Sequence, residues 1–265
     1  MKLTIAHSVD LDDAFMFWAL ASGRLDPHAW GFDALEFVTA ETEPLNRLAL
    51  DEAADVVAVS IAHVPALADR YLLLPHGGSM GRGYGPVVVA RRPLTSLSGA
   101  RVGVPGERTT AARLLSAAAP DAEQVLLPFA ESLPAIDRGD VEAAVLIHEG
   151  RLVYARLGYT LVLDLGAWWT ETKQLPLPLG GNVIRRALGT DTITRASAML
   201  RRSIEVALAY RADAIADLLP SRPAMTSSDA DEYLRLYANA DTLDYGSDGR
   251  AAVATLLGHE PRWAP

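Results

Sequence analysis

The chain of 265 residues contains no cysteine. This absence excludes disulfide frameworks, thiol nucleophiles and zinc sites built on cysteine, and it leaves the redox compartment undecided. Lysine is nearly absent too, since only Lys2 and Lys173 occur, and the formal net charge at pH 7 is -9. Proteins that bind nucleic acid neutralise phosphates with clustered Lys and Arg, and the sequence has no basic stripe. We therefore expect no nucleic-acid partner.

Long apolar runs are missing as well, because no stretch approaches the roughly 18 residues that a membrane helix requires. Residues 1–10 contain a short apolar run and then acidic side chains, which is unlike a signal peptide. We therefore expect a cytoplasmic protein without a membrane partner. Half of the residues are hydrophobic and 22% are charged, so the chain is an ordinary globular one, large enough for one big α/β domain or two compact ones.

Short apolar runs alternate with helical patterns, which predicts an α/β fold. The runs predict strands at residues 3–6, 35–40, 56–59, 87–90, 101–104, 125–127, 143–147 and 159–163. The helical patterns cover residues 12–21, 44–50, 109–115, 130–138, 192–219, 229–240 and 247–257.

This alternation restarts after residues 91–93, and the Pro-rich and then Gly-rich segment 175–181 suits a chain that passes between two lobes. We therefore assign residues 1–90 and 182–265 to lobe 1 and residues 91–181 to lobe 2. Two strands would form the hinge, and the ligand cleft would lie between the lobes. This is the architecture of periplasmic-type binding proteins.

His148 follows the apolar run Ala143–Ile147, which is bounded by acids and a glycine. Such a run is typical of a strand that is buried on both faces in a parallel sheet. Ligands collect outside the carboxyl ends of these strands, so a titratable side chain delivered there is a candidate for chemistry. The alternative is a histidine whose two ring nitrogens bind backbone groups at a strand-to-helix turn.

Hydroxyl groups follow two other predicted strands. Ser60 comes directly after strand 56–59, where the commoner role of a serine is to cap the next helix. Thr109 and Thr110 begin the helix after strand 101–104, and two hydroxyls beside the free amides of a helix amino terminus form an anion site. Capping by Thr109 is the structural alternative, and we favour a ligand carboxylate.

The segment Gly77–Pro86 is the richest in glycine. A phosphate-binding loop would end in Gly-Lys-Ser/Thr or open a helix with a glycine triad, and neither occurs here. We expect the glycines to allow positive φ angles and a close backbone approach to a ligand. Arg82 could pair with a substrate carboxylate or remain a solvated loop arginine.

Two short clusters have both a structural and a functional interpretation. Asp10, Asp12 and Asp13 could hold a metal ion, but carboxylates at a helix amino terminus are favoured by capping and by the helix dipole. We expect a cap from Asp10 or Asp12 and no metal. Trp168 and Trp169, expected beside a loop, could pack in the core or form the wall of an aromatic ligand site.

Several motifs along the chain form a specific set, although each is weak alone. They are Gly81–Pro86, Thr109–Ala111, Leu146–Glu149, Asp164–Trp169 and Leu175–Gly180, supported near the end by Tyr237–Ala240 and Leu243–Asp244. In this order they cover most of the chain and together resemble the 1,4-dihydroxy-6-naphthoate synthase family of the futalosine pathway to menaquinone.

The resemblance implies a two-lobed type II periplasmic-binding-protein-like fold that serves as a cytoplasmic lyase. It implies action on cyclic dehypoxanthinyl futalosine, a small-molecule carboxylate, without metal or organic cofactor. In that family the histidine of the Ile-His-Glu motif is the proposed base, and this role carries over to His148. The substrate-binding residues that carry over are Thr109, Thr110, Ala58, Val59 and Ser60.

The sequence departs from the family pattern in two places. The family usually has Ser-Pro-Cys-Pro-Asn-Asp-Thr-Phe near the amino terminus, whereas residues 8–15 read Ser-Val-Asp-Leu-Asp-Asp-Ala-Phe. This change adds negative charge. A lysine that is common two residues before the serine is replaced by Ala58, which removes a positive charge that could meet a substrate carboxylate.

As a mechanism, neutral His148 would remove a proton from the bound substrate, and the resulting carbanion or enolate would expel the sugar-derived fragment. An unperturbed pKa of about 6.5 keeps most of a histidine neutral at cellular pH. One alternative is a non-catalytic solute-binding protein for a small carboxylate. Another is the chorismate dehydratase of the same pathway, on the same fold. The segment Leu175–Gly180 and the Ile-His-Glu motif favour the naphthoate synthase. The sequence does not indicate an oligomeric state.

Overall fold

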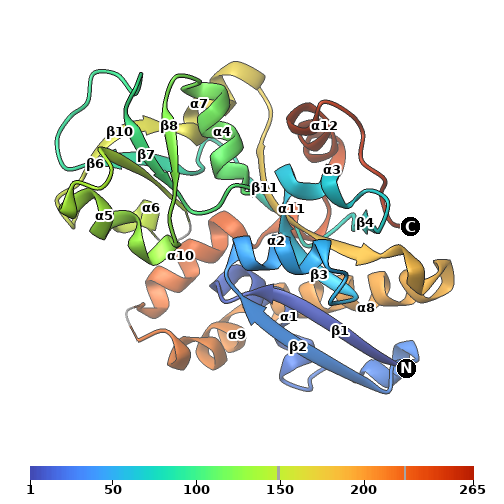
Figure 1. The fold of residues 1–265 in the computed structure, drawn as a ribbon. Helices are drawn as coiled ribbons and strands as arrows, with labels where there is room; N and C mark the ends of the chain where they lie inside the picture. The colour runs from blue at the N-terminus through green and yellow to red at the C-terminus, as the bar shows by residue number, and fades with distance from the viewer. Residues whose placement is uncertain (148–149, 224) are drawn as a thin grey trace. The chain divides into compact units, whose positions relative to one another are not determined.

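The computed structural model describes residues 1–147, 150–223 and 225–265 (Figure 1). The chain divides into two compact units, the first made of Met1–Met80 with Gly180–Pro265 and the second of Gly81–Leu179. Residues 81–90 were assigned above to lobe 1, but they lie in the second unit. Strand β6 (Val87–Ala90) pairs with β9 and β10 in the second unit. Strand pairing, which composition does not reveal, therefore moves this boundary towards the amino terminus.

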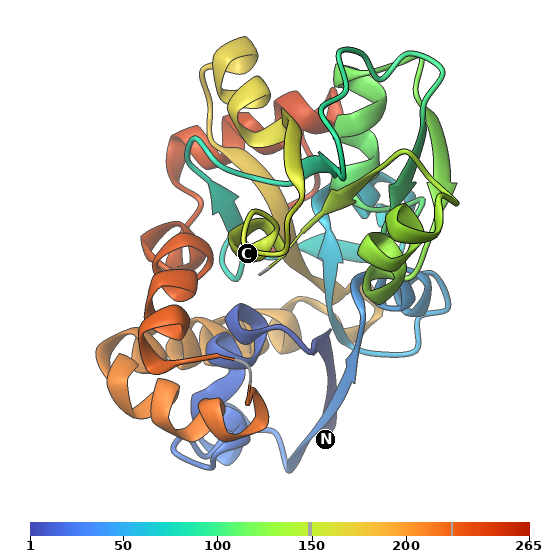
Figure 2. The ribbon, with the colours of Figure 1, turned by 90° about the vertical axis from the view of Figure 1, so that its left-hand side faces the viewer.

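The first unit is built on a mixed sheet in the order β2-β1-β3-β11-β4. Its strands are β1 (Lys2–Ser8), β2 (Ala34–Ala40), β3 (Val56–Ser60), β4 (Tyr71–Leu73) and β11 (Leu177–Arg185), and β5 (Ser79–Gly81) also pairs with β11. Strand β1 is parallel to both β2 and β3, and Figure 2 shows β1 and β2 side by side. The inserted β11 is antiparallel to β3 and to β4.

Two helices bury one face of this sheet. Helix α1 (Leu11–Ala21) is apolar almost all round, and it packs with α8 (Thr190–Ala209) in a core that includes Ile5 and Val56. Helix α2 (Thr42–Leu50) packs on β1 and β3. The remaining helices of this unit are α3 (Val64–Leu67), α9 (Arg211–Leu218), α10 (Ser227–Tyr237), α11 (Ala240–Leu243) and α12 (Gly246–Leu257). Among the described residues, no helix is both long and apolar enough to cross a membrane.

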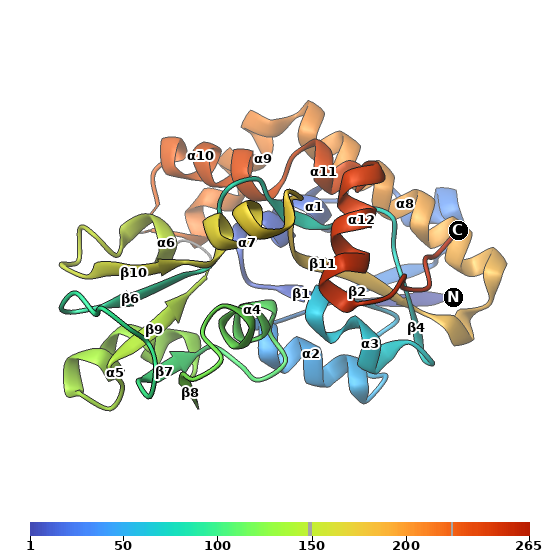
Figure 3. The ribbon, with the colours of Figure 1, turned by 90° about the horizontal axis from the view of Figure 1, so that it is seen from above.

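The second unit has a five-stranded sheet in the order β10-β6-β9-β7-β8 (Figure 3). Besides β6, its strands are β7 (Arg101–Val104), β8 (Glu123–Leu126), β9 (Ala143–Leu146) and β10 (Thr160–Asp164). Its helices are α4 (Thr110–Ala118), α5 (Ser132–Arg138), α6 (Gly150–Val153) and α7 (Leu165–Lys173). Strand β7 is parallel to β8 and β9, whereas β6 is antiparallel to β9 and β10. The strand before His148 is fully buried as predicted, but its sheet is mixed rather than parallel.

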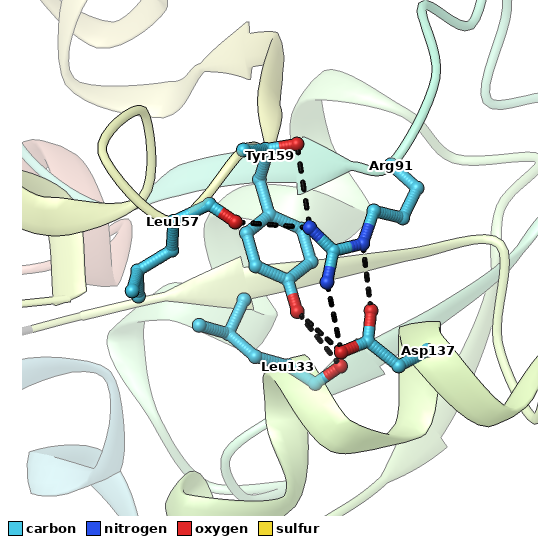
Figure 4. A network of polar contacts seen from close by, with 6 residues as sticks. Arg91, Leu133, Asp137, Leu157 and Tyr159 are labelled. Carbon is cyan, nitrogen blue, oxygen red and sulfur yellow. Dashed lines mark hydrogen bonds and ion pairs between the residues drawn. The ribbon is translucent and has the colours of Figure 1, made fainter.

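A polar network on the second unit joins the end of β6 to α5 and to the turn before β10 (Figure 4). The Arg91 guanidinium donates to both carboxylate oxygens of Asp137, at 2.8 and 3.0 Å, and to the carbonyl oxygen of Leu157 at 2.9 Å. It also lies 4.1 Å from the centre of the Tyr159 ring, whose hydroxyl donates to Asp137 at 2.9 Å. One arginine thus holds three segments together.

Candidate active site

The parallel strands of the first unit end at the same edge of its sheet. Strand β1 ends at Ser8 and the neighbouring β3 ends at Ser60, and parallel strands present their carboxyl ends at the same edge. The predicted residues Ala58, Val59 and Ser60 are the last three of β3, and all are buried. This edge is therefore the candidate ligand-binding edge of the first unit.

The Ser60 side chain does not cap a helix, so the structural alternative for this residue does not hold. The serine precedes the short 3-10 helix Ile61–His63, but its side chain accepts no bond from it. Asn46 of α2 instead binds both polar groups of the residue. The Ser60 amide donates to Asn46 Oδ1 at 2.9 Å, and Asn46 Nδ2 donates to Ser60 Oγ at 3.2 Å. Helix α2 thus fixes the Ser60 hydroxyl at the sheet edge through Asn46.

Ser8 is held on all its polar groups where β1 ends. Its amide donates to Asp13 Oδ2 at 2.7 Å, its carbonyl oxygen lies 2.8 Å from His7 Nδ1, and its hydroxyl donates to Asp10. Asp10 occupies the position before α1 but makes no side-chain cap, because its carboxylate binds the Ser8 hydroxyl. The expected cap by Asp10 or Asp12 is therefore wrong.

Asp12 and Asp13 are both buried, with 9% and 8% of their surface exposed. Asp12 accepts hydrogen bonds from the Ser79 hydroxyl at 2.8 Å and from the Tyr233 hydroxyl at 3.1 Å. Burial, together with repulsion from Asp12 and Asp10, raises the pKa of Asp13 well above its ordinary value. These acids were explained above by capping and by the helix dipole alone. The apolar surface of α1 was the available sign that its first turn would be buried too.

The described part of the chain contains no cluster of three His, Cys, Asp or Glu side chains arranged to hold a metal ion. Asp10 and Asp13 each accept a hydrogen bond from Ser8, and Asp12 accepts hydrogen bonds from Ser79 and Tyr233.

In the second unit, β7 and β9 are parallel neighbours and end at Val104 and Leu146. Thr109 caps α4, since its Oγ1 accepts from the Ala112 amide at 3.2 Å and donates to the Gly106 carbonyl at 2.8 Å. Thr110 Oγ1 donates to the Leu179 carbonyl at 2.7 Å. The structural alternative for Thr109 is thus confirmed. The two hydroxyls hold a helix amino terminus rigidly at this sheet edge.

His148 lies outside the described residues, together with Glu149. The chain is described up to Ile147, one residue beyond β9, and again from Gly150, where α6 begins. The end of β9 is therefore fixed beside the end of β7, the strand that leads into Thr109 and α4.

The glycine-rich segment packs against protein. A Cβ on Gly85 would lie 3.0 Å from Gly166 Cα, and one on Gly166 would lie 2.1 Å from the Gly85 nitrogen. Arg151 of α6 donates to the Gly85 carbonyl at 2.7 Å and pairs with Asp164 at 3.3 Å, and Asp164 caps α7. The expected close backbone approach thus occurs, but its partner is α7. Arg82 is exposed in the same segment, between β5 and β6.

The tryptophans lie in α7 and not beside a loop. Trp169 is buried, and its Nε1 donates to the Pro176 carbonyl at 3.0 Å, so it packs in the protein interior. Trp168, the residue before it, is half-buried.

A protein-family model described as menaquinone biosynthesis matches residues 3–260 of the chain. The chain belongs to this menaquinone biosynthesis family. Two curated proteins named 1,4-dihydroxy-6-naphthoate synthase are similar to it over almost their whole length. The one from Thermus thermophilus is 41% identical over 96% of this chain and 92% of its own. The one from Streptomyces coelicolor is 37% identical over 96% of this chain and 91% of its own.

The fold of this chain is similar to solved structures of the periplasmic-binding-protein-like type. A structural genomics target from Archaeoglobus fulgidus is 38% identical, with a TM-score of 0.90 over 97% of this chain and 96% of that one. The periplasmic aliphatic sulphonate binding protein of Escherichia coli is 16% identical, with a TM-score of 0.63 over 97% of this chain and 85% of that one. The predicted fold class is confirmed.

Proposed function

We propose that this protein is a 1,4-dihydroxy-6-naphthoate synthase, a carbon–carbon lyase of menaquinone biosynthesis. The observation that carries the proposal is the 41% identity to a curated enzyme of that name, which extends over 96% of the chain. The substrate would be cyclic dehypoxanthinyl futalosine. A biosynthetic role of this kind also supports our proposal that the protein acts in the cytoplasm.

His148 is the proposed general base. It follows β9 in the sequence, and β9 ends beside the strand that leads into α4, whose amino terminus has free helix amides. A neutral histidine would take a proton from the substrate, and the carbanion or enolate would then expel the sugar-derived fragment. General-base catalysis of this kind typically contributes about 10²–10⁴-fold in rate.

Each unit has its own proposed substrate-binding residues. The amino terminus of α4, organised by Thr109 and Thr110, would bind the substrate carboxylate through backbone amides. Ser60, whose hydroxyl Asn46 orients, would form a second contact together with the backbone of Ala58 and Val59. Arg82, which is exposed in the second unit, would pair with a substrate carboxylate.

The test is to incubate the pure protein with cyclic dehypoxanthinyl futalosine and to follow 1,4-dihydroxy-6-naphthoate by chromatography. We expect turnover by the wild type, and no turnover but intact ligand binding by His148→Asn. Binding without product would indicate a solute-binding protein. Dehydration of chorismate to 3-enolpyruvyl benzoate would indicate the sister enzyme. Full activity of the His148→Asn variant would remove the histidine from the mechanism.

A further inference from the structure

The three hydroxyl groups proposed for substrate binding differ in whether the protein already uses their hydrogen atoms. Thr109 Oγ1 donates to the Gly106 carbonyl at 2.8 Å, and Thr110 Oγ1 donates to the Leu179 carbonyl at 2.7 Å. The Ser60 hydroxyl has no acceptor for its hydrogen among the described residues. Of these three side chains, Ser60 is therefore the one that can donate a hydrogen bond to a ligand without breaking a bond within the protein.

Asn46 fixes the direction of the Ser60 hydroxyl. This side chain of α2 is fully buried, and its Oδ1 accepts from the Ser60 amide at 2.9 Å. The Ser60 amide settles the orientation of the carboxamide, because the reverse orientation would set Nδ2 against another donor. Nδ2 therefore donates to Ser60 Oγ, at 3.2 Å, and the hydroxyl oxygen is the acceptor in this bond. The hydroxyl hydrogen must then point away from Asn46.

Ser60 stands at the candidate ligand-binding edge of the first unit. At the end of the neighbouring parallel strand β1, Ser8 donates its hydroxyl hydrogen to Asp10, so the protein itself uses that donor. Ser60 has only 3% of its surface exposed, and a buried donor that lacks an acceptor is unfavourable. An oxygen atom of a bound ligand would remove this cost.

We propose that Asn46 is a positioning residue for substrate binding, because it makes Ser60 a hydrogen-bond donor to a carboxylate or carbonyl oxygen of the substrate. The inference rests on the proposed function, in which Ser60 contacts the substrate, and it adds the direction of that contact. A substrate group that can only donate, such as an ammonium group, is rejected at this position, since donor would face donor.

Two substitutions of Asn46 separate this positioning role from packing. Asn46→Asp keeps the size of the side chain but reverses the hydroxyl. One carboxylate oxygen still accepts from the Ser60 amide, and the other, which replaces Nδ2, accepts the hydroxyl hydrogen. Ser60 then has no hydrogen left for the substrate. Asn46→Ala removes both bonds and leaves the hydroxyl free to rotate, so Ser60 can still donate.

The experiment measures kcat, KM and the dissociation constant of cyclic dehypoxanthinyl futalosine. The proteins are wild type, Ser60→Ala, Asn46→Asp, Asn46→Ala and the two double variants that combine Ser60→Ala with each Asn46 change. We expect Ser60→Ala and Asn46→Asp each to weaken binding about 10–100-fold, with kcat changed less than about threefold. Asn46→Ala should weaken it only about threefold, through the rotational freedom that the hydroxyl regains.

The double variants test whether Asn46 acts through Ser60. In the Ser60→Ala background neither Asn46 change should weaken binding further, because the hydroxyl that Asn46 directs is gone. The matched control is Asn239→Asp, which introduces the same acid into the same unit at a position where its oxygen can still accept from the Asp241 amide. This control should leave substrate binding unchanged.

Unchanged binding by Ser60→Ala overturns the proposal. A larger loss for Asn46→Ala than for Asn46→Asp also overturns it, because a packing role predicts that order. An Asn46→Asp loss that persists in the Ser60→Ala background would indicate charge repulsion and is equally fatal.

If Asn46→Asp does not fold, the cycle of Asn46→Ala and Ser60→Ala decides, and additive losses refute the inference. A wild type that binds the substrate but forms no product contradicts the proposed function instead. The dissociation constants of the same variants then still test the role of Asn46, so the two failures are distinguished.

Discussion

Gly85 and Gly166 lie so close that neither residue has room for a side chain. A Cβ on Gly166 would stand 2.1 Å from the Gly85 nitrogen and 2.6 Å from the Tyr84 carbonyl oxygen. The contact packs the glycine-rich segment onto the first turn of α7, and the bond from Arg151 to the Gly85 carbonyl reinforces it.

Gly166→Ala should therefore destabilise the second unit by about 1–3 kcal/mol, because the added methyl group meets rigid backbone and forces the two segments apart. The measurement is chemical denaturation followed by circular dichroism. Gly150→Ala is the matched control, since Gly150 also stands in a first helical turn and its Cβ would come no closer than 3.4 Å to any neighbour. Equal stability of both variants would contradict the prediction.

Arg91→Lys should cost more stability than the same change at Arg138. Arg91 binds Asp137 through two nitrogens and stacks on Tyr159, a geometry that an ammonium group does not reproduce. Arg138 of α5 is exposed to a similar degree, but it makes a single contact with each of Glu131 and Asp140, and such pairs are worth about 0–1 kcal/mol. We expect a loss of about 1–2 kcal/mol for Arg91→Lys in urea melts. A larger loss for Arg138→Lys would refute this ranking.

Thr109→Ala should remove the cap of α4 and cost about 1 kcal/mol of stability. If the α4 amides bind the substrate carboxylate, the variant should also raise KM more than it lowers kcat. Thr109→Ser keeps the hydroxyl and should change neither quantity. Steady-state kinetics and thermal melts of the two variants test both parts, and an equal effect of Ala and Ser would show that the hydroxyl is unimportant.

His76 should make the protein sensitive to acid. Burial lowers the pKa of this histidine from 6.5 to about 4, with a further contribution from Arg201. The folded state therefore binds the proton less well than the unfolded chain does. The stability contribution is complete above pH 6.5 and is lost as the pH falls towards about 4, for a total of about 3 kcal/mol.

His76→Gln should flatten this pH dependence, because Gln is uncharged and can still bond to Ser197 as His76 Nε2 does at 3.1 Å. Denaturation midpoints of wild type and variant between pH 4 and 7 provide the measurement. His28→Gln is the control, since that histidine is exposed. An unchanged slope in His76→Gln would disprove the assignment.

The apolar runs predicted much of the fold. Residues 87–90 and 101–104 form strands at the predicted bounds, and the bounds of the other predicted strands differ by at most two residues at either end. Strands β4, β5 and β11 were not predicted. These runs are continuous and buried, so hydrophobicity alone defines them. Helix α7 was missed because its pattern is weakly amphipathic. Its start is set by Asp164, whose carboxylate accepts hydrogen bonds from the Gly166 and Ala167 amides, and the apolar pattern does not reveal these bonds.

The candidate site was less predictable where contacts join distant segments. The sequence indicated hydroxyls at strand ends, and Ser60 and Thr109 do stand there. It did not indicate that Asn46 would bind Ser60, nor that Ser79 and Tyr233 would meet Asp12. Those partners depend on tertiary packing, which also buries Asp12 and Asp13.

The insertion of β11 between β3 and β4 dictates an order of assembly on the ribosome. Strands β3 (residues 56–60) and β4 (residues 71–73) emerge long before β11 (residues 177–185), which lies between them in the folded sheet. In contrast, every strand of the other sheet is translated within residues 87–164. The middle of the chain can therefore acquire its structure while the amino-terminal strands still await their neighbour. During synthesis those strands expose unpaired edges, and they are the segment for which a chaperone would matter most.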